Sequence, residues 1–297
     1  MDRIGFMSIF RLERNIDEWT YRAYNAAGMK LSESMAINGG IGTESFYWIK
    51  CEPSFPSFAD FIFGYHEKVF AVALIRTRIV DGHREIDPDY KGLEYLESVS
   101  RKNNFIPYIM PINQDLTFLL PGWGLMNPGF VTKGENLETI RPEEFGSDDE
   151  RALISDWELR NLAAITIKEE ISKGSDKIKG IMTLDTSASP EVIYYDDKGE
   201  LHYVIVKYVV LPMTEVVLDD DVRIVQKKME AMGRLHAHGH FTIVGFKSSE
   251  PDGKLYRRRG ISIAINRIVP LDSNEMQKGT EILSAFRSLI DTEESSD

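Results

Sequence analysis

Residues 189–208, SPEVIYYDDKGELHYVIVKY, contain an acid and a base at positions that could do metal chemistry. The turn-forming DDKG between two apolar runs predicts a β-hairpin, with Glu191 opening its first strand and Lys207 near the end of its second. Glu158 lies upstream, in a segment that predicts a helix. Paired carboxylates bind Mg²⁺, which lowers the pKa of a bound water, and a nearby lysine orients that water. The pattern is typical of metal-dependent nucleases.

One ligand position of this pattern holds an apolar residue. Side chains two residues apart on a strand share a face, so an acid at position 205 would point the same way as Lys207. The residue there is Ile205, which cannot coordinate a metal. The nearest acids are Asp185, Asp196 and Asp197, and the last two belong to the predicted hairpin turn.

Three interpretations of Glu191 and Lys207 stay open. They could form a structural ion pair across two strands, which contributes little stability at a sheet edge. They could belong to a residual or relocated metal site. The same pocket could also have a different binding role.

The second half of the chain resembles the PD-(D/E)XK nuclease superfamily over residues 150–270. Glu158 matches the helical glutamate of the family, Pro190 and Glu191 match its PD element with Glu for Asp, and residues 205–207 match (D/E)XK without the acid. The resemblance implies a restriction-endonuclease-like fold. It also implies that Glu158, Glu191 and Lys207 are the catalytic positions and that Glu158 and Glu191 would hold Mg²⁺.

The two halves of the chain also resemble each other. Residues 58–76 align without a gap to residues 189–207, and 95–112 resemble 228–246 in the same order. We therefore expect a tandem duplication in which the first copy lacks the same acid. The alignment pairs Asp60 with Glu191, Leu74 with Ile205 and Arg76 with Lys207.

The hydrophobic pattern predicts an α/β protein of two similar mixed-sheet domains, each with helices flanking a central sheet. We expect domains at 1–140 and 146–291, joined by the polar stretch 133–150, and a disordered tail at 292–297. Helices are predicted at 15–37, 90–104, 148–174, 219–239 and 273–290, with strands between them.

Two further motifs contain basic residues that are candidates for binding a metal ion or a phosphate group. His236, His238 and His240 alternate, and on a strand they could hold zinc, but the end of a helix and a glycine favour a turn there. The run RRR at 257–259 could contact phosphate or serve as solubilising charge on an edge strand.

Composition narrows the class of protein. The chain has a net charge of −12 and a single cysteine, Cys51. The acidic balance disfavours nucleic acid as a general partner, and one cysteine excludes a disulfide framework. Charges near the start exclude a signal-peptide core, and no apolar run is long enough for a membrane span, so we expect a cytoplasmic protein.

These observations favour a catalytically decayed PD-(D/E)XK-like interaction or scaffold protein without a cofactor. Its expected partner is another protein of unknown identity or a second copy of the chain. The alternative is a Mg²⁺-dependent phosphodiesterase or nuclease with a relocated acidic ligand, so the sequence leaves enzymatic activity open.

Overall fold

The computed structural model describes residues 18–37, 46–51, 58–81, 83–86, 92–113, 151–173, 177–184, 190–212, 225, 227 and 237–271. The chain divides into two compact units, with the described residues before Leu153 in the N-terminal unit and those from Leu153 onward in the C-terminal unit. Each unit contains one mixed sheet, so the protein is of the mixed α/β class. The predicted linker and tail, the helix at 273–290 and most of the one at 219–239 lie outside the described residues.

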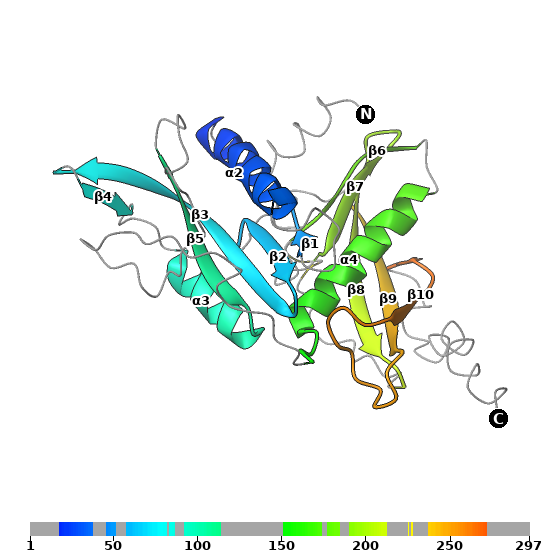
Figure 1. Ribbon diagram of the computed structural model, residues 1–297. Helices are drawn as coiled ribbons and strands as arrows, with labels where there is room; N and C mark the ends of the chain where they lie inside the picture. Colours follow the sequence, from blue (N-terminus) through cyan, green and yellow to red (C-terminus); the bar gives the residue numbers. More distant parts are fainter. Residues whose placement is uncertain are drawn as a thin grey trace. The chain divides into compact units, whose positions relative to one another are not determined.

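A five-stranded sheet forms the centre of the N-terminal unit (Figure 1). Strands β1 to β4 pair antiparallel in sequence order, whereas β5 runs parallel to β3. A parallel pair needs a crossover connection, which α3 supplies here. The elements are α2 (Glu18–Ile37), β1 (Phe46–Lys50), β2 (Phe61–Tyr65), β3 (Lys68–Val80), β4 (His83–Ile86), α3 (Leu93–Lys102) and β5 (Ile106–Asn113).

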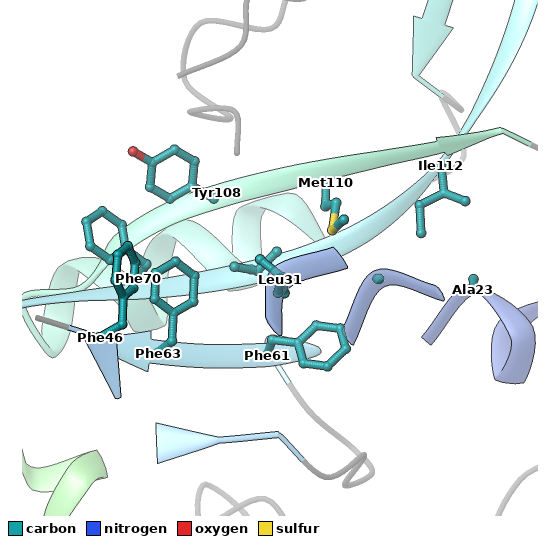
Figure 2. Close-up of a cluster of buried hydrophobic side chains, with 11 residues drawn as sticks. Ala23, Leu31, Phe46, Phe61, Phe63, Phe70, Tyr108, Met110 and Ile112 are labelled. Carbon is teal, nitrogen blue, oxygen red and sulfur yellow. The ribbon is translucent and has the colours of Figure 1, made fainter. Parts of the chain in front are cut away.

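An aromatic core joins α2 to this sheet (Figure 2). The Phe63 and Phe70 ring centroids lie 5.1 Å apart, and those of Phe70 and Tyr108 lie 5.3 Å apart. Small residues of α2, Ala23 and Ala27, belong to the same cluster and let the helix approach the sheet closely. Burying one large apolar side chain contributes about 1.5–3 kcal/mol, so this cluster is a main source of the unit's stability.

A six-stranded sheet forms the centre of the C-terminal unit, in the order β10-β9-β8-β7-β6, with β11 also paired to β9. Here β8 and β9 are parallel and the other pairs are antiparallel. The elements are α4 (Asp156–Lys173), β6 (Ile178–Thr183), β7 (Val192–Asp196), β8 (Leu201–Val210), β9 (His238–Ser248), β10 (Ile261–Ile265) and β11 (Val269–Pro270). Figure 1 shows α4 lying across strands of this sheet.

Side chains of β8 alternate between two cores. Val204 and Val206 pack with residues of α4, including Ala163. Ile205 and Val209 belong to the other cluster, which contains no described residue of α4. This alternation follows from the period of two along a strand and assigns each β8 residue to one face.

The two units pair their strands in the same pattern. In each, a helix precedes three antiparallel strands, and the third strand gains a parallel neighbour from later in the chain. The hairpins differ in turn length. Lys68 pairs directly after the turn 66–67, whereas the Asp196 N–H donates to the Glu200 carbonyl across the longer turn 197–199.

The predicted strands of both hairpins are confirmed, and so are the helices represented by α2 and α3. The predicted start of the helix at 148–174 is wrong, because α4 begins at Asp156. Residues before it pair with another segment instead: Leu153 forms a bridge with Tyr256, and the Ile154 N–H donates to the Leu255 carbonyl at 3.0 Å.

Replacing Gly64 of β2 by alanine tests the packing of the N-terminal unit. A β-carbon there would overlap the Tyr47 ring, so we expect Gly64→Ala to lower the free energy of unfolding by about 1–3 kcal/mol. Gly28→Ala is the matched control in α2. Its β-carbon would lie 3.4 Å from Phe61, an ordinary contact, and alanine favours a helix, so this variant should be neutral or more stable. Chemical denaturation measures both, and equal values for the two would contradict the packing argument.

Candidate functional site

Glu158, the helical acid of the predicted site, caps α4 and forms a buried ion pair. One carboxylate oxygen accepts the Ser155 N–H at 2.9 Å, and the Ser155 hydroxyl oxygen accepts the Glu158 N–H at 3.3 Å. This is a capping box, in which a serine and a glutamate three residues later satisfy each other's free N–H groups. The signal S-x-x-E is visible in the sequence SDWE and accounts for the glutamate without any metal.

Arg257 holds the same carboxylate from the other side. Its Nε lies 2.9 Å from Glu158 Oε1 and its Nη2 lies 2.8 Å from Oε2. The guanidinium therefore binds the carboxylate in a bidentate manner, through two parallel hydrogen bonds. The side chains are only 3% and 8% exposed. The expectation that Arg257 is a phosphate contact or a solubilising charge on an edge strand is therefore wrong. It lies in the β9–β10 connection and fixes that connection to the start of α4.

A second contact ties the start of α4 to β8. The Tyr208 hydroxyl donates to Asp156 Oδ1 at 2.6 Å. Burial of the phenol, followed by the hydrogen bond and charge of Asp156, raises the pKa of Tyr208, so the hydroxyl keeps its proton at neutral pH. Tyr208 and Arg257 together position the first turn of the helix.

Glu191, the strand acid of the predicted site, is 3% exposed and bonds to the neighbouring strand. Its Oε2 accepts the Val206 N–H at 2.9 Å, and its carbonyl accepts the Leu184 N–H at 2.7 Å. The residue therefore links both strands that flank β7, one through its side chain and the other through its main chain. A buried carboxylate bonded in this way stabilises the hairpin.

Asp60 makes the corresponding contact in the N-terminal unit. Its Oδ2 accepts the Leu74 N–H of β3 at 2.7 Å. The alignment without a gap pairs Leu74 with Ile205, but this hydrogen bond makes Leu74 correspond to Val206. The second hairpin has a turn that is one residue longer, which accounts for the shift. The two acids stay equivalent across the units.

Because of the same one-residue shift, Arg76 and Lys207, which the alignment pairs, do not occupy equivalent positions in the two sheets. By strand register, Arg76 corresponds to Tyr208 and Lys207 corresponds to Ile75. Alternation puts Lys207, which is half-buried, on the face of Ile205, whereas α4 with Glu158 packs against the opposite face. The structure thus does not bring Glu158 and Lys207 to one face of the sheet.

A different group of side chains has the geometry of a metal site. In the parts of the chain that the structure describes, one donor atom from each of Glu200, His202 and His238 lies within 4.8 Å of the other two. His238 and His240 are on β9, so the turn predicted for them is wrong, and His236 lies outside the described residues. The sequence had suggested no carboxylate beside these histidines, because Glu200 is far from them along the chain.

Removing one partner of the buried ion pair should destabilise the C-terminal unit strongly. Arg257→Ala leaves the Glu158 carboxylate buried without its counter-charge, which costs about 3–5 kcal/mol. Arg259→Ala is the control, since Arg259 is exposed in the same loop and its loss should cost less than about 0.5 kcal/mol. Denaturation of Arg257→Ala and Arg259→Ala compares these costs, and Arg257→Met, Glu158→Gln and the variant that combines the two measure the coupling between the side chains. A cost for Arg257→Ala similar to that of Arg259→Ala would contradict a structural ion pair.

Amide and alanine replacements should distinguish a structural Glu191 from a metal ligand. Glu191→Gln keeps an oxygen that accepts the Val206 N–H, so it should destabilise less than Glu191→Ala, which leaves a buried donor unsatisfied at a cost of about 1–3 kcal/mol. Asp60→Asn and Asp60→Ala should show the same order in the other unit. The reverse order in thermal unfolding would contradict the assignment of both acids to the hairpins.

No helix among the described residues is long and apolar enough to cross a membrane. No protein-family model, curated protein or solved structure matches the chain significantly.

Proposed function

We propose that the protein is a non-catalytic interaction or scaffold protein built on a PD-(D/E)XK-like framework, acting in the cytoplasm on another protein or on a second copy of itself. The observation that carries the proposal is the buried contact between Glu158 and Arg257. In a metal-dependent nuclease the helical acid has to be available to the ion. Here an arginine and a main-chain N–H already occupy both of its oxygens.

The second acid supports the same conclusion. Glu191 Oε2 accepts a main-chain N–H, and Ile205 supplies no oxygen two residues before Lys207. Mg²⁺ is usually held by one or two carboxylates with water completing the octahedron, so each acid of the site has to offer an oxygen to the ion. No group of three metal-ligating side chains among the described residues contains Glu158 or Glu191.

We also infer that the chain arose by tandem duplication. The two units share their strand-pairing pattern, and each uses an acid before its central hairpin to accept an N–H from the following strand. A duplicated ancestor with this hydrogen bond accounts for Asp60 and Glu191 together. On this view, both acids are retained for the hairpin, and the missing (D/E)XK acid is common to the two copies.

The alternative function, a Mg²⁺-dependent nuclease with a relocated acid, would require Glu158 to leave Arg257. Separating a buried ion pair leaves one charge uncompensated and costs about 3–5 kcal/mol. A metal ion would have to offset that cost in order to bind there.

A cleavage assay tests the proposal directly. Single- and double-stranded DNA and RNA, incubated with the full chain and Mg²⁺ or Mn²⁺, should show no cleavage above that of the Glu158→Gln, Glu191→Gln double variant. Sedimentation of the same protein measures self-association, and crosslinking in extract tests for a protein partner. Metal-dependent cleavage that the double variant lacks would overturn the proposal in favour of the nuclease.

A further inference from the structure

Three strands of the C-terminal unit place aromatic and imidazole rings side by side. Tyr194 on β7 pairs with His202 on β8, and His202 pairs in turn with His238 on β9. The His202 ring stacks on Tyr194 with centroids 4.7 Å apart and on His238 with centroids 4.8 Å apart. His240 lies two residues further along β9, so alternation puts it on the same face.

The β7–β8 turn brings two carboxylates to these rings. Asp196 Oδ1 accepts the N–H groups of Lys198 at 3.0 Å and Glu200 at 2.7 Å, which fixes the turn. Glu200 then lies two residues before His202, and its Oε2 is 3.4 Å from His238 Nε2. The second carboxylate oxygen of Asp196, Oδ2, is 3.6 Å from His202 Nε2.

His202 has one nitrogen that its surroundings leave unsatisfied. Its Nδ1 lies 3.0 Å from His240 Nε2, which is a hydrogen bond. Its Nε2 is buried and has no hydrogen-bond partner among the described residues, and the 3.6 Å to Asp196 is too long for one. In the tautomer that carries its hydrogen on Nδ1, Nε2 has a lone pair available for a ligand, with Asp196 Oδ2 3.6 Å away.

The N-terminal unit shows that the fold does not need these histidines. Phe63 faces Phe70 across β2–β3 at the register where Tyr194 faces His202 across β7–β8. Tyr108 of β5 pairs with the second residue after Phe70, just as His240 pairs with the second residue after His202. Figure 2 shows Phe63, Phe70 and Tyr108 packed in an apolar core. One sheet therefore has Phe70 and Tyr108 at the positions where the other sheet has His202 and His240.

We propose that Glu200, His202 and His238 bind one zinc-type divalent transition-metal ion. Their donor atoms already lie within 4.8 Å of one another. Ligand atoms around a tetrahedral zinc ion with bonds of about 2.0–2.1 Å lie about 3.3 Å apart, close to the 3.4 Å between Glu200 and His238. The side chains of these two residues are 50% and 52% exposed, so they are free to make the small movement that closes the site.

The ligand types select the metal class. Two imidazoles and one carboxylate suit zinc, iron and related ions, whereas Mg²⁺ prefers oxygen alone. Three protein ligands leave a fourth position for water or another molecule. His240 would act as a positioning residue, because its hydrogen bond to Nδ1 orients the His202 ring toward the ion.

Calorimetric titration of the chelator-treated full chain with zinc sulfate tests the site. We expect one ion per chain, bound far more tightly than Mg²⁺. His202→Gln and His238→Gln should each weaken binding by more than about 100-fold, and His240→Gln by about 10- to 100-fold, as is typical for an outer partner. Titration with Co²⁺ gives a second readout, since its visible absorption reports nitrogen and oxygen ligands in a tetrahedral site.

Two variants serve as matched controls. His66→Asn removes a histidine from the β2–β3 turn, where asparagine tolerates the φ of 52°, and Asp197→Asn removes an acid from the β7–β8 turn. Both should bind zinc like the unmodified chain. Circular dichroism without metal should show that His238→Gln folds, because its side chain is half exposed. The proposal is overturned if the chain binds no zinc, if His202→Gln and His238→Gln bind it unchanged, or if His66→Asn weakens binding equally.

Discussion

Alternation of side chains along β8 determines what each candidate residue can reach. Val204 and Val206 must face α4 to complete the core, so Ile205 and Lys207 face the other way. A one-residue shift of this strand would exchange the two sets between the two cores and turn Lys207 toward α4, which is why the register is strongly fixed. The same constraint keeps Lys207 from the helix that carries Glu158, and it aligns His202 with the histidines of β9.

Acids of both units accept main-chain N–H groups in different structural settings. Asp60 and Glu191 each accept an N–H of the neighbouring strand, while Glu158 joins a capping box to an arginine from a distant loop. In each case a carboxyl oxygen satisfies donors that would otherwise lack this hydrogen-bond partner. An acid in such a contact resembles a metal ligand in sequence, because a structural site and a catalytic one both place carboxylates at the ends of strands and helices.

The two sheets share a pairing pattern but differ in the chemistry of one face. The N-terminal sheet covers that face with phenylalanine and tyrosine, and the C-terminal sheet places imidazoles at the matching register. Gly239 lies between two of these imidazoles. A β-carbon there would overlap Tyr203 and Leu271, so glycine allows close packing on the opposite face while the histidines keep their position.

The sequence by itself determined most of the elements, because the hydrophobic periods and the DDKG turn act over a few residues. The S-x-x-E signal at the start of α4 is equally local, but the helix predicted at 148–174 begins ahead of it. The sequence predicted the mixed α/β class, both hairpins and the strands around them. It could not determine contacts between residues that are far apart in the sequence and come together only in the folded chain. Arg257 reaches Glu158 across 99 residues, and Glu200 reaches His238 across a parallel strand pair whose register no local signal specifies. Only the tertiary structure decided that the predicted nuclease acids are bonded within the protein, and that histidines predicted to lie in a turn stand on a strand beside a carboxylate.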